Sequence, residues 1–143
     1  MSEEFPFINA VVTPSATEDL PTFEQPAWNF ETDKFIYDGN GNHVTVYENE
    51  AIKVWCYKAL KTERFSYMAY SWRYGIELYP FVGKVMSVQE RYSELKRVII
   101  ECLMVNPYIK SIDSVKFEPA NKGNKVNTTI NMTTIYGEVS LNV

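Results

Sequence analysis

The segment KVNTTINMTTIYGEVSLNV, residues 125–143, decides the fold. Its side chains alternate with a period of two over eleven residues and again after Gly137, and this period is typical of β-strands. Gly137 lies between the two patterns and marks either a tight hairpin or a bulge. The alternating positions are Val126, Thr128, Ile130, Met132, Thr134 and Tyr136, then Val139, Leu141 and Val143.

A further strand is expected earlier, because residues 109–143 as a whole favour strands. Val115 and Phe117 share one face of it, Pro119 ends it, and residues 121–124 form a turn. The last strand is expected at an edge of the sheet, where unpaired N–H and C=O groups can accept a strand from another chain. Val139, Leu141 and Val143 are therefore candidate interface residues.

Two helices are expected before the strands. Over residues 88–105, Ser87 and Glu90 form a capping box, a broad apolar stripe follows, and Pro107 stops the helix. Residues 48–63 carry apolar side chains at helical spacing, with Asn49 as a candidate cap. Helices followed by antiparallel strands predict an α+β fold.

The segment between the helices, residues 64–83, is aromatic and irregular, because Gly75, Pro80 and Gly83 interrupt any long element. We expect a loop with one helical turn near residues 76–82. Two groups of residues are candidate contacts with partner proteins, although they equally suit a core role: Tyr70, Trp72 and Tyr74 in this loop, and Asn106, Pro107 and Tyr108 after the second helix.

The N-terminal part divides into an arm and a hairpin. Residues 34–38 and 43–47 flank a dense turn signal at residues 38–42, which predicts a β-hairpin. Residues 1–30 form an extended acidic arm with four prolines, and residues 31–143 form a single α+β domain. The arm carries large apolar groups, among them Phe5, Phe7 and Trp28, which we expect to pack on the body or on a partner; a disordered leader is the alternative.

Charge is distributed unevenly along the chain. Residues 1–33 hold 7 acids and no Lys or Arg, leaving 11 acids and all 14 bases to residues 34–143. The arm is either a solvated tail or a segment that docks on a basic surface, its own or a neighbour's. The body is too weakly basic for nucleic-acid binding, and no apolar run is long enough to span a membrane.

Residues able to do chemistry are few. His43 is the single histidine and lies beside a turn, so no zinc set or Cys–His pair forms; Cys56 and Cys102 are expected to be buried free thiols. Residues 38–42 superficially resemble a calcium loop, but the twelfth position is Asn49 instead of Glu. Several carboxylates, Glu63, Glu77, Glu90, Glu94, Glu101 and Asp113, are explained more simply as surface charges than as a glycosidase pair. We expect no enzyme activity, no cofactor and no metal.

Two motifs, residues 60–64 (LKTER) and 70–78 (YSWRYGIEL), resemble the XkdS-like prophage tail proteins, relatives of the contractile-tail baseplate wedge protein in a family historically titled "lysozyme-like". The resemblance covers roughly residues 30–143 and includes residues 35–41 and 134–139. It departs from the family where a Glu-Pro-Arg triplet is replaced by Asn106-Pro107-Tyr108, so the family's charge pairing there is not expected.

The resemblance implies a structural baseplate wedge subunit, assembled in the bacterial cytoplasm and located in a virion or a phage-tail-like particle. Six copies around the tail axis are implied. Implied partners are other wedge proteins, the tail sheath protein, whose strands the domain accepts as a template, and tube or hub proteins. Two rivals stay open: a peptidoglycan hydrolase of the tail, and a soluble adaptor that binds one partner through its sheet edge.

Overall fold

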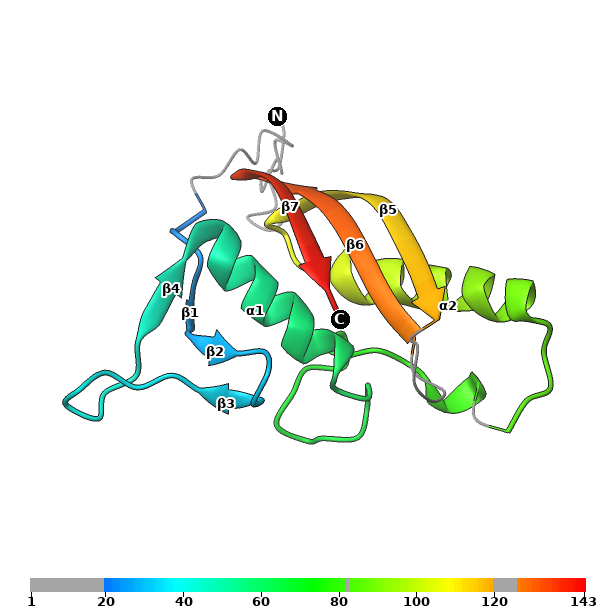
Figure 1. The fold of residues 1–143 in the computed structure, drawn as a ribbon, viewed down its shortest axis with the longest axis horizontal. Coiled ribbons are helices and arrows are strands. Elements are labelled where there is room, and N and C mark those ends of the chain that lie inside the picture. The colour runs from blue at the N-terminus through cyan, green and yellow to red at the C-terminus, as the bar shows by residue number, and fades with distance from the viewer. Residues whose placement is uncertain (1–19, 82, 120–125) are drawn as a thin grey trace, which may run out of the picture.

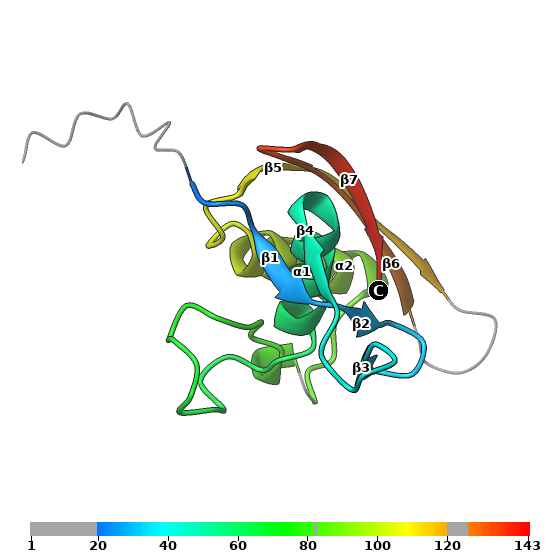
Figure 2. The ribbon, with the colours of Figure 1, turned by 90° about the vertical axis from the view of Figure 1, so that its left-hand side faces the viewer.

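The structure is a computed structural model, and it describes residues 20–81, 83–119 and 126–143. The predicted α+β class is confirmed: two long helices pack against a C-terminal three-stranded antiparallel sheet, and short strands lie on the N-terminal side (Figure 1). Figure 2 shows both helices on the concave side of the curved sheet.

The C-terminal sheet has the order β5-β6-β7 and contains β5 (Ile109–Pro119), β6 (Val126–Thr134) and β7 (Gly137–Asn142). Gly137 pairs with Thr134 across a two-residue connection and has a φ of +115°, so the predicted Gly137 feature is a tight hairpin. The alternation predicted from the sequence is the observed burial pattern. Ile130, Met132 and Thr134 are buried, and Asn131 and Thr133 between them are half-buried, whereas Val126 at the start of the strand is exposed.

Helix α2 (Val88–Leu103) begins at the predicted capping box, in which the Ser87 hydroxyl accepts from the Glu90 amide and the Glu90 side chain accepts from the Ser87 amide. Helix α1 (Glu48–Leu60) ends three residues before the predicted boundary. Asn49 is not its cap, because the helix begins at Glu48 and Tyr47 occupies the cap position without a side-chain hydrogen bond. The Asn49 side chain accepts from Thr134 Oγ1 at 2.7 Å and donates to the Tyr136 carbonyl at 3.4 Å.

The core lies between the two helices and the inner face of the sheet. Helix α1 is buried on more sides than the single predicted stripe, because β1 also packs on it. Cys56 and Cys102, both free and buried as predicted, belong to this core. Each large apolar side chain buried here contributes about 1.5–3 kcal/mol. The fully buried members are Ile52, Cys56, Ala59, Leu103, Ile130 and Met132.

The turn of the predicted N-terminal hairpin is present: Tyr37 forms a β-bridge with His43, and the Asp38 side chain accepts hydrogen bonds from the amides of Asn40 and Asn42. The strands on either side of this turn do not pair with each other but with residues that precede the hairpin in sequence. Strand β3 (Lys34–Phe35) pairs with β2 (Trp28–Asn29), and β4 (Thr45–Tyr47) pairs with β1 (Glu24–Pro26). A two-stranded hairpin alone is marginally stable, so pairing with residues 24–29 adds the support it needs.

Candidate protein-interaction surfaces

Strand β7 is an edge of the sheet, paired only with β6 among the described residues. Val143 exchanges both backbone hydrogen bonds with Thr128 at 2.9 Å, and the register continues without a shift to Gly137. Because paired residues of an antiparallel ladder alternate, Val139 and Leu141 also bond toward β6. The N–H and C=O groups of Glu138, Ser140 and Asn142 therefore point away from the sheet.

The inward side chains of β7 pack in the core and are not available to a partner. Val139 is 6% exposed and Leu141 4% exposed, and Val143 is partly buried against the same core. The three candidate interface residues of β7 thus hold the strand in the fold by their side chains. Contact with a partner strand remains a prediction, and in this geometry the backbone of the alternate residues would make it.

The aromatic loop, residues 64–78, is closed at its base. The Arg64 amide donates to the Ile76 carbonyl at 2.9 Å, and the Ile76 amide donates to the Thr62 carbonyl at 2.9 Å. One carboxylate, that of Glu63, accepts from the amides of Leu78 and Tyr79. Charge-assisted bonds of this kind are about twice as strong as neutral ones, so Glu63 fixes the end of the loop. The loop leads into the 3₁₀ turn η1 (Tyr79–Phe81), within the range predicted for a helical turn.

Gly75 is required at this closure. Its φ is +103°, and a Cβ atom there would lie 2.7 Å from the Thr62 carbonyl oxygen. Arg64, whose side chain is 13% exposed, then ties the loop to α2 through Glu101 at 3.3 Å and pairs with Glu77 at 3.5 Å. The loop is therefore a compact, anchored structure of the kind that often carries function.

The tip of the loop presents apolar side chains to solvent. Trp72 is 82% exposed, and Tyr70 packs on Tyr74 with 4.7 Å between the ring centres. Isolated exposed apolar residues are ordinary, but several within one anchored loop make the loop a candidate contact surface. The other exposed members of the loop are Phe65, Tyr67, Met68 and Tyr70.

The two segments predicted to contact partners are brought together. Ser71, Arg73 and Tyr74 of the loop and residues 105–108 after α2 line one hollow of about 300 Å³, together with Phe23 and Trp55. Within it Pro107 is exposed, whereas Asn106 is 4% exposed and accepts from the Tyr108 amide, so Asn106 shapes the corner. The Tyr108 hydroxyl donates to the Pro21 carbonyl at 2.6 Å and fastens the N-terminal segment there.

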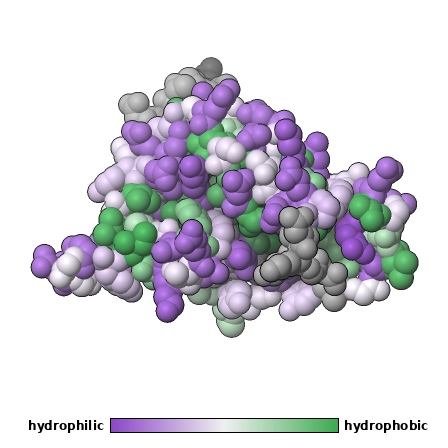
Figure 3. Space-filling model, in the orientation of Figure 1, coloured by the Kyte–Doolittle hydropathy of each residue, from purple (hydrophilic) through white to green (hydrophobic). Residues whose placement is uncertain are grey.

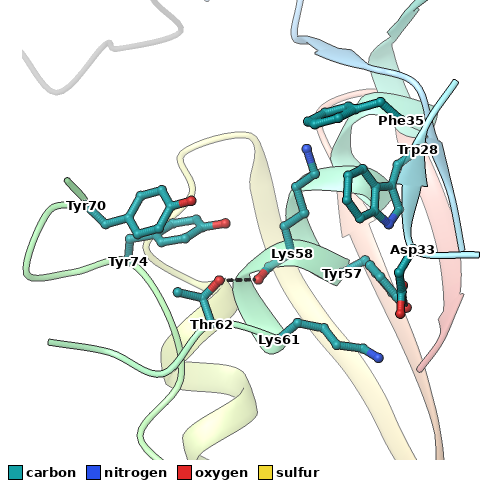
Figure 4. Close-up of a pocket in the computed structure, with 9 residues that line it drawn as sticks. All are labelled: Trp28, Asp33, Phe35, Tyr57, Lys58, Lys61, Thr62, Tyr70 and Tyr74. Carbon is teal, nitrogen blue, oxygen red and sulfur yellow. Dashed lines mark hydrogen bonds between the residues drawn. The ribbon is translucent and has the colours of Figure 1, made fainter. Parts of the chain in front are cut away.

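Trp28 lines a second, aromatic groove of about 380 Å³ (Figure 4). Trp28 and Phe35 form one wall, the end of α1 forms the floor, and Tyr70 and Tyr74 form the opposite wall. On this side of the molecule, around β1–β4, apolar side chains also gather on the surface in Figure 3; Phe35, Ile36 and Val44 are more than a third exposed. Phe5 and Phe7 lie outside the described residues.

Sequence reasoning singled out these aromatics but missed the polar residues that position them. The sequence predicts Glu63 only as one of several surface carboxylates. Arg64 and Lys58 had no predicted role. The available signal was the pair of opposite charges, Glu63 and Arg64, directly after a helix and before a glycine-containing loop.

The described residues offer little for catalysis or metal binding. Burial raises the pKa of the Cys102 thiol to about 12 and also raises that of Cys56, so both thiols stay protonated and unreactive. No group of three or more His, Cys, Asp or Glu residues in the described ranges is placed to hold a metal ion. Helices long and apolar enough to cross a membrane are also absent from those ranges.

Comparison with protein families assigns this chain to a family. The family model described as "Contractile injection system sheath initiator" matches residues 25–137, from within β1 through both helices, the aromatic loop, β5 and β6 to Gly137, the first residue of β7. A search of curated proteins found no match. Because the family model covers more than half of the chain, the chain belongs to the contractile injection system sheath-initiator family.

Proposed function

We propose that this chain is a baseplate wedge subunit that starts sheath assembly by accepting an extended strand from a sheath subunit along β7. The role is structural and involves no catalysis. Family membership supports a function in a contractile sheath system, such as a phage tail or tail-like particle. The strand-accepting mechanism rests on one observation, the regular open edge of β7.

The edge suits strand addition because its backbone groups are presented in a fixed register. Glu138, Ser140 and Asn142 offer three outward N–H and C=O pairs at successive alternate positions. The β6–β7 hairpin is fixed at its turn by the Thr134 hydroxyl, which lies 2.7 Å from Asn49 Oδ1 of α1 and 3.1 Å from the Gly137 carbonyl oxygen. A preorganised edge loses little conformational entropy when a strand binds.

Wedge partners are assigned to a separate surface, the anchored aromatic loop and the hollow beside it. Trp72 and Pro107 are the exposed anchors of this surface, and Arg73 supplies a cation. Large aromatic residues and arginine contribute most to protein interfaces. In this arrangement six copies would hold the wedge by one side and the sheath by the other.

The experiment removes one outward donor without touching the core. Ser140→Pro deletes the outward N–H of an edge strand, where proline is tolerated, and Ser140→Ala is the matched control. A lost backbone bond with an unpaired partner carbonyl costs about 1–3 kcal/mol. Sheath assembly on baseplates should fall on the order of tenfold or more for the proline variant only. This substitution is sharper than truncating residues 139–143, which would also remove the core side chains Val139 and Leu141.

Normal sheath assembly by a folded Ser140→Pro protein would refute strand acceptance along β7. Thermal unfolding of both variants shows whether the proline variant is folded. A pure-protein turbidity assay on peptidoglycan separates the hydrolase alternative, and we expect no clearing. Sedimentation with tail particles, as opposed to a free pool, separates the soluble adaptor.

A further inference from the structure

The aromatic groove of Figure 4 contains two cations that form no ion pair with a carboxylate in the described part of the chain. The Lys58 ammonium lies 4.6 Å from the Trp28 ring centre and 4.5 Å from that of Phe35. The Lys61 ammonium lies 4.9 Å from the Tyr57 ring centre. Ion pairs among the described residues involve other cations, Lys53, Arg64 and Arg97. The groove therefore carries uncompensated positive charge.

The remaining polar groups of the groove do not neutralise this charge. Asp33 is the single acid among the lining residues, so its one carboxylate, which also accepts the hydrogen bond of the Tyr57 hydroxyl, offsets only one of the two lysines. Partial burial lowers the pKa of Lys58, which is the expected response of an ammonium group without a counter-ion. The Trp28 indole N–H is also buried and has no acceptor within the described part of the chain.

Together these groups define the ligand. Aromatic walls favour flat apolar side chains, and cations near them favour carboxylates. The open shape, between two strands and a loop, suits an extended peptide more than a compact metabolite. An acidic, aromatic, extended segment meets all of these requirements.

This chain carries such a segment near its N-terminus. Residues 1–19 hold four acids and no bases, and residues 3–7 read Glu-Glu-Phe-Pro-Phe. Pro6 fixes φ near −65° and disfavours helix, which favours an extended backbone. We propose that residues 3–7 occupy the groove of their own chain, with the Phe5 and Phe7 rings between the aromatic walls and the Glu3 and Glu4 carboxylates against Lys58 and Lys61.

The connection is long enough for docking within one chain. The Phe23 carbonyl accepts from the amide of Glu48, so residue 23 lies at the start of α1. Lys58 lies ten residues further along this helix, about 15 Å away along its axis. Pro21 is held by the Tyr108 hydroxyl, so the connection available is residues 8–19, which can span roughly 40 Å when extended. The segment would cover an exposed aromatic surface, and its docking is independent of any strand added to β7.

Paramagnetic broadening in the full chain tests this assignment. A spin label on Ser2→Cys is selective, because Cys56 is 0% exposed and Cys102 1% exposed. The three indole N–H signals serve as reporters: Trp28 lines the groove, Trp55 lines the neighbouring hollow, and Trp72 lies on the exposed loop. Docking predicts stronger broadening of the Trp28 signal than of the Trp55 signal. Equal broadening of both, or none, would overturn it.

Charge variants give the second readout. Lys58→Gln with Lys61→Gln should weaken docking about fivefold, the combined effect expected for two exposed charge pairs, and should relieve the Trp28 broadening. Lys84→Gln with Lys96→Gln, exposed lysines away from the groove, should leave it unchanged. Unchanged broadening in the first variant would count against the proposal.

A mixture of spin-labelled chains with separate isotope-labelled chains detects docking between copies. Trp28 broadening that is equally strong in this mixture would overturn docking within one chain.

Discussion

The two edges of the C-terminal sheet differ in every feature that governs strand pairing. Strand β5 has two register shifts, several charged residues and Pro119 at its end. By the alternation of the ladder, Pro119 occupies an outward position, where its missing N–H removes a donor. Strand β7 pairs in continuous register and carries a single charge, Glu138.

Bulges, charges and proline are the devices by which natural sheets prevent unwanted pairing. These devices are concentrated on β5, whereas β7 carries only the charge of Glu138, so the sheet has a protected edge and an open edge. An open, regular edge is a liability in a protein without a strand-accepting role. The contrast therefore supports strand acceptance more strongly than the existence of an edge alone.

The largest expected effect separates side-chain and backbone roles within β7. Leu141→Ala removes a side chain that is 4% exposed and should lower the free energy of unfolding by about 2–4 kcal/mol. Ser140→Ala, on the exposed face, should change it by less than about 0.5 kcal/mol. Denaturant unfolding measures both. A loss below about 1 kcal/mol for Leu141→Ala would show that β7 is not held by the core.

The next effect tests whether the loop and the edge are separate surfaces. Gly75→Ala places a Cβ against the Thr62 carbonyl at a φ of +103° and should cost about 1–3 kcal/mol of stability. Binding to wedge partners should weaken because the loop shifts, whereas strand binding to β7 should persist. The two bindings are measured separately on the same folded protein. An equal loss of wedge-partner binding and of strand binding would show that the loop and β7 belong to one surface.

A smaller effect comes from Tyr74, in the wall shared by the groove and the hollow. Burial raises the pKa of Tyr74 from 10 to about 12. Because the folded protein holds this proton more tightly than the unfolded chain, its contribution to stability is present below pH 10 and is lost as pH rises toward 12. The stability of the Tyr74→Phe variant should fall less than that of the wild type between pH 8 and pH 11. Denaturation midpoints at the two pH values provide the measurement, and identical falls would contradict it.

The smallest effect is expected on the protected edge. Pro119→Ser restores a single outward donor on β5 but leaves both bulges and the charges in place. Stability should change by less than about 0.5 kcal/mol, and sheath assembly should be unaffected. A marked change in sheath assembly would indicate that β5, not β7, receives the partner strand.

Local sequence signals predicted the elements whose pattern is regular. The capping box at Ser87, the alternation of β6 and the turn at residues 38–42 each follow from contacts close in sequence. These elements form as predicted because the tertiary contacts around them favour the same local structures. The α+β class followed from the order of these elements.

Long-range contacts could not be predicted in the same way. The pairing of residues 24–29 with β3 and β4, and the capture of the Asn49 side chain by Thr134, depend on segments up to 85 residues apart. Asn is a residue type that often caps helices, but the Asn49 side chain instead accepts a hydrogen bond from the Thr134 hydroxyl. The role of Glu63 depends on the backbone amides of residues 78 and 79, which no local pattern reveals.

Amide hydrogen exchange along β7 tests the central claim most directly. In the isolated chain Val139 and Leu141, bonded to β6, should exchange slowly, and Glu138, Ser140 and Asn142 should exchange at least about tenfold faster. Addition of the sheath protein should slow these three amides. Protection of all five amides in the isolated chain, or no change at the three when sheath assembles, would contradict strand acceptance at this edge.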